Sequence, residues 1–289
     1  MSTTEAAPPS PAPRALFTGL VDDAAVFPPG LAPLPDAVVR HRELRTGPDA
    51  DLVGPLLVPV PATAQLRYIA AGSPAAPTLR VSLVARPGTP VRELLHAVGE
   101  LEGVPDLEVV AVELAHQPGW EEALGQGPPV VVEVPRDPFA QQRAMEEVAR
   151  ARGEHPVRAK FRTQATPAAP VPTPAELATF VVRCIRRETP FKLTGGLHHA
   201  VAGTRPAAEG GTEDQHGVLN VLLATRAALD GAEAGAVAEV LAVRDADRLA
   251  RETATLTEEQ AREVRAAFTS YGCCGVLDPL TELHDLHLI

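Results

Sequence analysis

The chain has 289 residues, 45% of them hydrophobic and 22% charged, and its mean hydropathy is +0.01. This composition supplies a packed core and excludes a disordered or fibrous protein, and the length suits one α/β barrel of about 250 residues or slightly more. A formal net charge of -11 disfavours nucleic acid as a partner, and no apolar run approaches the roughly 18 residues that cross a bilayer, so no membrane association is expected.

The start of the chain is rich in Pro and Ala and lacks the pattern of a secretory signal, which predicts a disordered leader over 1–14 and a cytoplasmic protein. The three cysteines, Cys184, Cys273 and Cys274, lack CxxC spacing. They disfavour a disulfide framework or a zinc ribbon and are expected to be small core or turn residues.

From residue 15 onward, apolar runs alternate with segments of helical spacing. The expected strands are 15–27, 52–60, 79–86, 107–115, 129–136, 157–163, 191–199 and 268–276. Helices are expected after them, at 35–45, 62–70, 89–102, 118–126, 138–152, 173–188 and 216–229. Near-continuous Val, Ile and Leu runs, each followed by an amphipathic helix, indicate parallel strands that are covered on both faces.

Eight such units predict a (β/α)8 TIM barrel, an α/β fold that occupies 15–289 as a single domain. An open doubly wound sheet is the alternative, but its first turn should carry GxGxxG, which this chain lacks. The segment 236–245 competes with 268–276 for the eighth strand. A lid-like insertion is expected around 200–267, beginning with a flexible Gly- and Ala-rich loop at 200–215.

Lysine usage is the most informative count. Of the 26 basic residues, only Lys160 and Lys192 are lysine, and the other 24 are arginine. Because only lysine can become a neutral amine nucleophile or form a Schiff base, these two positions are candidates for catalysis.

Active sites of barrels lie at the carboxyl ends of the strands, so polar residues late in each strand are candidates. They are Asp22 and Asp23 in the first strand, Glu113 in the fourth, Glu133 in the fifth, Lys160 and Arg162 in the sixth, and Lys192 and Thr194 in the seventh. Residues two apart share one face of a strand. The cations Lys192 and Arg162 are therefore expected beside Lys160, where they would favour its neutral form.

Five strand ends carry short motifs that include these residues. Lys192-Leu193-Thr194-Gly195-Gly196, Lys160-Phe161-Arg162-Thr163, Leu20-Val21-Asp22, Val131-Val132-Glu133 and Tyr271-Gly272-Cys273-Cys274 each resemble a strand motif of the deoxyribose-phosphate aldolase family. The resemblance implies a barrel in which Lys160 forms a Schiff base, Lys192 tunes it and an acidic residue assists proton transfer. It also implies substrate contacts from the Gly-Gly and Gly272 motifs.

The chain departs from the family pattern at three places. Gln164-Ala165 replaces Gly-Lys, Cys274 replaces Ser, and His198-His199 replaces Arg. Because these family residues belong to the phosphate site, the sequence leaves open whether the substrate carries phosphate. For the family's fourth-strand Asp, Glu108 is the nearest match in sequence, but Glu113 lies at the barrel mouth and is the expected residue.

Histidine supplies a competing interpretation. His198, His199 and His216, with Asp22 or Glu113, would provide the ligands for Zn²⁺ or Fe²⁺ in a metal-dependent hydrolase, lyase or isomerase. Adjacent residues on a strand point in opposite directions, which disfavours joint ligation by His198 and His199. A third alternative is a barrel that has lost catalysis and serves as a binding or scaffold protein.

The sequence thus favours a lyase of class I aldolase type that acts on a small aldehyde or ketone, which can be anionic, and needs no cofactor. Lys160, Lys192, Asp22, Glu113 and Glu133 are the expected catalytic residues. The expected substrate-binding residues are Arg162, Thr194, Gly195, Gly196, His198, His199 and Gly272. A homo-oligomer is compatible with this interpretation.

Overall fold

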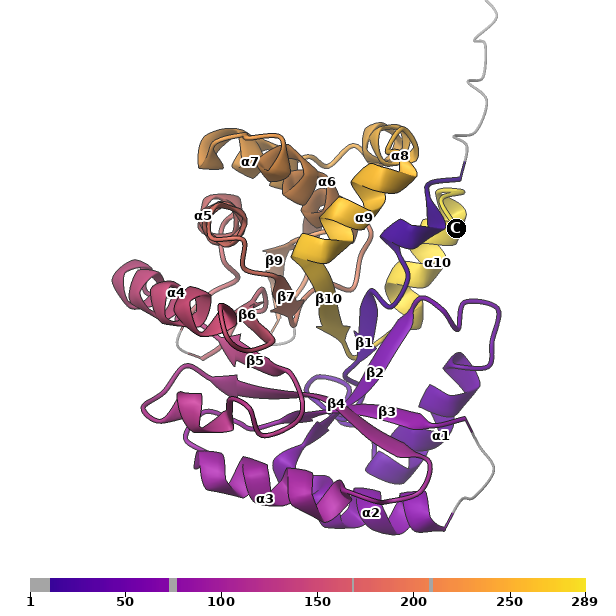
Figure 1. Ribbon diagram of the computed structural model, residues 1–289. Coiled ribbons are helices and arrows are strands. Elements are labelled where there is room, and N and C mark those ends of the chain that lie inside the picture. Colours follow the sequence, from indigo (N-terminus) through magenta and orange to yellow (C-terminus); the bar gives the residue numbers. More distant parts are fainter. Residues whose placement is uncertain (1–10, 73–76, 168, 208–209) are drawn as a thin grey trace, which may run out of the picture.

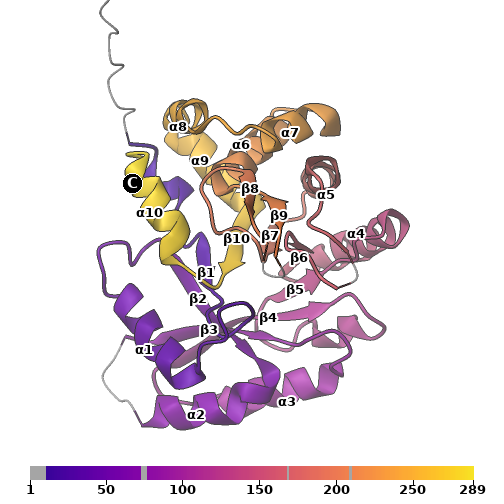
Figure 2. The same ribbon diagram turned by 180° about the vertical axis from the view of Figure 1, so that it is seen from behind.

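The computed structural model describes residues 11–72, 77–167, 169–207 and 210–289 and shows a closed barrel of eight parallel strands. The strands follow the order β1-β10-β7-β6-β5-β4-β3-β2 around the barrel. Helices lie around the outside of these strands (Figures 1 and 2). The predicted (β/α)8 TIM barrel is therefore confirmed.

The barrel strands are short and mostly buried. They are β1 (Val21–Asp23), β2 (Val53–Pro59), β3 (Leu79–Val84), β4 (Leu107–Ala115), β5 (Val130–Glu133), β6 (Val157–Arg162), β7 (Phe191–Thr194) and β10 (Phe268–Cys273). The segment 268–276 does supply the last strand, whereas the competing segment 236–245 lies mostly in helix α7 (Ala234–Leu241).

The remaining helices surround the barrel. They are α1 (Leu34–Leu44), α2 (Thr63–Ala71), α3 (Val91–Leu101), α4 (Pro138–Arg152), α5 (Pro174–Arg186), α6 (Val218–Leu229), α8 (Ala246–Ala254), α9 (Glu258–Ala267) and α10 (Leu277–Asp285). Some of these helices, such as α8, pack on other helices. The α5 helix begins with a capping box, in which Thr173 and Glu176 satisfy each other's backbone N–H groups. Stacked and edge-on rings of Phe161, Phe180, Phe191 and Phe268 join α5 and the β6, β7 and β10 strands.

Several predicted elements were wrong in extent, including the strands expected at 129–136 and 191–199, which cover only four residues each. The first strand covers three residues rather than 15–27, because a 3₁₀ helix at Arg14–Leu16 and the left-handed Gly19 (φ 60°) precede it. The helix expected at 118–126 is a single 3₁₀ turn, Trp120–Ala123, since left-handed glycines at 119 and 125 bound it.

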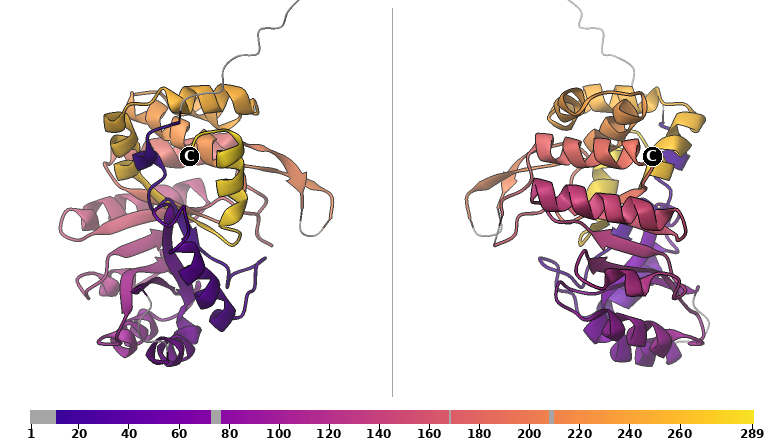
Figure 3. Two further views of the ribbon diagram at one scale, coloured as in Figure 1. Left: turned by 90° about the vertical axis from the view of Figure 1, so that its right-hand side faces the viewer. Right: turned by 60° about the vertical axis from the view of Figure 1, so that its left-hand side comes forward.

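The loop predicted over 200–215 forms a hairpin of β8 (Gly203–Pro206) and β9 (Thr212–Gln215). Figure 3 shows these two strands projecting away from the barrel. They border a separate cavity with Pro172 and Arg244, and residues 218–267 that follow are mostly helices α6 to α9. A lid role for the hairpin stays a prediction.

Most of the leader predicted over 1–14 lies outside the described residues. Ala12 is buried, and its N–H donates to the carbonyl of Leu288 at 3.2 Å, so the packed part of the chain begins before residue 15. Among the described residues, no helix has the length and hydrophobicity that a membrane-spanning segment requires.

Candidate active site

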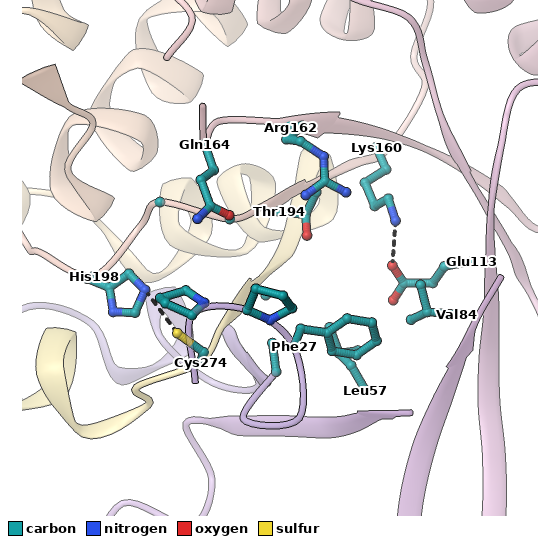
Figure 4. Close-up of a pocket in the computed structure, with 16 residues that line it drawn as sticks. Phe27, Leu57, Val84, Glu113, Lys160, Arg162, Gln164, Thr194, His198 and Cys274 are labelled. Atoms are coloured by element: carbon teal, nitrogen blue, oxygen red, sulfur yellow. Dashed lines mark hydrogen bonds and ion pairs between the residues drawn. The ribbon is translucent and has the colours of Figure 1, made fainter. Parts of the chain in front are cut away.

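A small cavity opens at the carboxyl ends of the barrel strands (Figure 4). Its polar wall includes Glu113, Lys160, Arg162, Gln164 and Thr194, and its apolar wall includes Phe27, Leu57 and Val84. Gly195, Gly196, Gly272, His198 and Cys274 also line it. The barrel mouth therefore combines a lysine with carboxylates in a small, partly apolar space, as enzyme sites typically do.

Lys160 is buried at the end of β6, with 3% of its surface exposed. Its Nζ atom lies 3.1 Å from Oε2 of Glu113 and 2.9 Å from Oε2 of Glu133. Alternate residues of β6 face inward, so Lys160 and Arg162 project to the same side, as predicted. Lys160 is consequently the lysine that a ligand in the cavity would contact.

Lys192 lies deeper, beside Lys160 in the register between β7 and β6. Its Nζ atom donates to Oδ2 of Asp22 and to Oε1 of Glu113, both at 2.6 Å. Together with Asp22, it borders a cavity on the opposite side of the cluster from the Lys160 cavity. Both carboxylates raise the pKa of Lys192 against the effect of burial, which keeps it an ammonium ion.

Glu113 joins the two lysines. Its Oε1 accepts from Lys192 and, at 2.9 Å, from the Ser82 hydroxyl, while its Oε2 accepts from Lys160 at 3.1 Å. Burial would raise the pKa of Glu113, but Lys192 and Lys160 outweigh it and lower that pKa to about 2. Glu113 is therefore a fixed carboxylate that positions both amines.

Asp22 is the carboxyl group at the base of the cluster. Its Oδ2 accepts from Lys192 and, at 2.8 Å, from the Ser270 hydroxyl. Burial raises the pKa of Asp22 although Lys192 opposes that shift. The glycine at position 54 in β2 leaves room for the Asp22 side chain, because a Cβ atom there would lie 2.1 Å from Oδ1 of Asp22.

Glu133 links Lys160 to Arg162. Nε and Nη2 of Arg162 donate to the two oxygens of Glu133 at 2.9 and 3.2 Å. Lys160 and Arg162 lower the pKa of Glu133 against its burial, so it too is a carboxylate. Cations and acidic side chains thus alternate in the cluster. Lys192 and Arg162 do not contact Lys160 directly, because Glu113 lies between Lys192 and Lys160, and Glu133 lies between Arg162 and Lys160.

The predicted glycine motif bends the chain at the mouth. Gly195 and Gly196 have φ values of 73° and 75°, which end β7 after Thr194. A Cβ atom on Gly195 would lie 2.7 Å from the Cβ of Gln164, so the glycine lets the two turns pack together. The residues Thr194, Gly195, Gly196 and Gly272, which the sequence predicts to contact substrate, all line the cavity.

The three histidines do not converge. Nδ1 of His198 lies 2.9 Å from Asp278, and Nδ1 of His199 lies 2.6 Å from Glu282, whereas Nε2 of His216 lies 2.8 Å from a backbone carbonyl. Of the three, His198 lines the cavity. In the part of the chain that the structure describes, no group of three His, Cys, Asp or Glu side chains has a metal-binding arrangement.

His199 was expected to bind substrate, but the structure does not bring it to the cavity. Its Nδ1 pairs with Glu282 of α10, and its carbonyl accepts from Val218 at the start of α6. Both histidines lie beyond Thr194, the last residue of β7, and of the two only His198 lines the cavity. His199 therefore anchors α10 and α6 to the barrel.

Two further acidic residues, Asp23 and Glu108, lie away from the cluster. Asp23 faces away from the cluster, where it accepts from the Ala25 N–H and lies 3.0 Å from Nδ1 of buried His41. Glu108 lies in an exposed ion pair with Arg80 at the start of β4, far along the strand from Glu113. The geometric argument for Glu113 is confirmed as to its position.

Several site residues were missed from the sequence. Ser82 and Ser270 orient the carboxylates, and the segment Phe27-Pro28-Pro29 forms part of the cavity wall. Cys274 also lines the cavity, where only a core or turn role was expected. The inward parity of β3 and β10 was available as a signal for the two serines.

No protein-family model matches the chain, and comparison with curated proteins and with solved structures finds no match.

Proposed function

We propose that the protein is a carbon–carbon lyase of class I aldolase type, in which Lys160 forms a Schiff base with a small aldehyde or ketone. The observation that carries the proposal is the position of Lys160. It is one of only two lysines, it lines the cavity, and two carboxylates lie within 3.1 Å of its amine. Such a buried amine with adjacent proton acceptors has the components that Schiff-base catalysis requires.

The first step removes a proton from Lys160. Glu133 is the nearer acceptor, with Oε2 at 2.9 Å, and Arg162 donates to both of its oxygens. The neutral amine attacks the substrate carbonyl carbon, and the carbonyl oxygen leaves as water once it has gained two protons. A base then takes the proton of the substrate's β-hydroxyl group, the Cα–Cβ bond breaks, its electron pair passes to the iminium to give an enamine, and the other fragment leaves as an aldehyde. Protonation of the enamine carbon and addition of water release the second carbonyl product and return the Lys160 amine.

Lys192 and Glu113 position the amine in this proposal. Glu113 is held by Ser82 and Lys192, so its second oxygen stays directed at Lys160. Asp22 acts through Lys192 and has no contact with the cavity of its own among the described lining residues. The Lys192 ammonium stays paired with Asp22 and Glu113 beneath Lys160 and so holds Glu113 in place.

The cavity walls set the substrate class. Phe27, Leu57 and Val84 would cover the carbon skeleton, whereas Thr194 and Gln164 offer hydrogen bonds to hydroxyl groups. Arg162 is already paired with Glu133, so an anionic group would have to share this guanidinium. A small hydroxylated aldehyde or ketone fits these walls without displacing the ion pair.

The test is reductive trapping. The full chain is incubated with a panel of short aldehydes and ketones and with borohydride, and its intact mass is recorded. We expect a stable adduct in the native protein, none in Lys160→Arg, and a slower-forming adduct in Lys192→Arg. Arg80→Lys supplies a matched control, because it adds an exposed lysine on β3 that should not gain an adduct.

No adduct across the panel would contradict the proposal. Stoichiometric bound metal in such a protein would favour the metal-dependent alternative. Neither adduct nor metal would favour a binding or scaffold role, since a barrel fold does not by itself imply catalysis.

A further inference from the structure

A second group of reactive side chains borders the same cavity, across from Lys160 (Figure 4). The Sγ atom of Cys274 lies 3.4 Å from Nε2 of His198. The other ring nitrogen of His198, Nδ1, lies 2.9 Å from Oδ2 of Asp278. A thiol, an imidazole and a carboxylate in this order are the arrangement that activates a nucleophilic cysteine.

The local backbone builds this group from two chain segments. The β10 strand ends at Cys273, which places Cys274 at the barrel mouth, and Asp278 lies in the first turn of α10. Gly275 makes the approach of the carboxylate possible, because a Cβ atom there would lie 2.2 Å from Oδ2 of Asp278. The glycine therefore permits the contact between Asp278 and His198.

The two adjacent cysteines have different environments. Cys273 is 1% exposed and donates to the carbonyl of Gly275 at 3.3 Å, and burial raises the pKa of its thiol. Cys274 is partly exposed and lines the cavity. Of the two, Cys274 is thus the one that a ligand can reach.

The ring of His198 contacts both cysteine sulfur atoms and the Asp278 carboxylate. Hydrogen bonds to Cys273 and Cys274, with a further one to Asp278, raise the pKa of His198 to about 11. The ring is therefore an imidazolium near neutral pH, and its Nε2 proton points to Cys274. This is the protonation state that stabilises a neighbouring thiolate.

We propose that Cys274, with His198 and Asp278, forms an acyl-transfer site that takes small activated esters or thioesters. The Cys274 thiolate attacks the acyl carbonyl carbon and forms a carbon–sulfur bond. The bond from that carbon to the leaving oxygen or sulfur breaks, and the leaving group takes the Nε2 proton of His198.

Hydrolysis then completes the cycle. A water molecule attacks the thioester and gives a proton to Nε2 of His198, and the carboxylic acid leaves. This restores the thiolate and the imidazolium. The apolar wall of Phe27, Leu57 and Val84 in the same cavity suits a short acyl chain.

The test uses p-nitrophenyl acetate on the full chain. We expect a burst of p-nitrophenolate, and intact mass with peptide mapping should find one acetyl group on Cys274. Cys274→Ala should abolish both signals. Cys184→Ala, which changes a thiol fully buried in α5, should keep them.

A second pair of variants separates activation from simple thiol exposure. His198→Gln should slow acylation by about 10²-fold and change its pH profile, because the imidazole no longer holds the thiolate. Gly275→Ala should also slow acylation by displacing Asp278. The acylation rates of both variants are compared with that of the native protein after circular dichroism spectra and Tm values have shown that the variants are folded.

Two results would overturn the proposal. One is acetylation of Lys160, Lys192 or the N-terminus with no label on Cys274. The other is an acylation rate in folded His198→Gln that equals the rate of the native protein, since Cys274 would then be an ordinary accessible thiol.

Discussion

The shared carboxylate Glu113 offers a quantitative test of the buried ion network. In Glu113→Gln the new amide keeps the shape of the side chain but no longer neutralises Lys160 and Lys192, whose Nζ atoms lie 3.1 and 2.6 Å from the two carboxylate oxygens. Removing one partner of a buried ion pair costs about 3–5 kcal/mol. Because Glu133 and Asp22 remain as partners, we expect a loss of about 3 kcal/mol in the free energy of unfolding.

The lowered pKa of Glu113 gives a similar value for the contribution of this side chain to the free energy of unfolding. Its pKa falls from 4.5 to about 2 in the folded protein, which at about 1.4 kcal/mol per pKa unit is about 3 kcal/mol of stabilisation. A carboxyl group with a lowered folded-state pKa stabilises fully above its unfolded pKa. This contribution should therefore be present above pH 4.5 and be lost as the pH falls toward 2.

The assay is thermal unfolding of the native protein, Glu113→Gln and Glu108→Gln. We expect Glu113→Gln to lower Tm by about 6–12 °C at pH 7, and the difference to shrink as the pH falls below 4.5. Glu108→Gln is the matched control on the same strand, since its exposed pair with Arg80 should contribute less than about 1 kcal/mol. Equal Tm values for the two variants, or a difference that does not change with pH, would refute the reasoning.

Three further predictions concern the frame around the site. Gly54→Ala places a Cβ atom 2.1 Å from Oδ1 of Asp22 and should cost about 2 kcal/mol by urea unfolding; an unchanged midpoint would show that Asp22 can move freely. Asp23→Asn replaces an acceptor in the buried contact with His41 and should cost about 1–3 kcal/mol, read as a lower Tm; a Tm equal to that of the native protein would contradict a structural role. Asn220→Ala removes the acceptor of the Ala202 N–H and the donor to the carbonyls of Val240 and Val243, and it should cost about 3 kcal/mol, measured by urea unfolding; a loss below about 1 kcal/mol would mean that water replaces the amide.

The pattern of apolar runs in the sequence predicted most of the barrel strands. The buried runs at 52–60 and 107–115 differ by at most two residues from the strands that form there, because parallel strands covered on both faces need continuous apolar sequence. The first strand and the helix expected at 118–126 were less predictable. Left-handed glycines such as Gly19 and Gly119 redirect the chain there, and their φ angles depend on tertiary packing.

The polar cluster followed from strand parity and from the scarcity of lysine. Lys160 and Lys192 do lie beside each other in adjacent strands, with Glu113 between them. What parity could not supply was which carboxylate pairs with each cation, since this depends on depth along strands that are distant in sequence. The contact of His198 with Asp278 was likewise hidden, because 80 residues separate the two partners.

The most direct test of the proposed Schiff-base chemistry is peptide mapping of the borohydride-reduced native protein. The chain has only two lysines and an N-terminal amine, so the modified amine can be assigned without ambiguity. The account predicts that the reduced adduct lies on the peptide that contains Lys160, with Lys192 unmodified. An adduct on Lys192 or on the N-terminus alone, or no adduct on any amine, would contradict it.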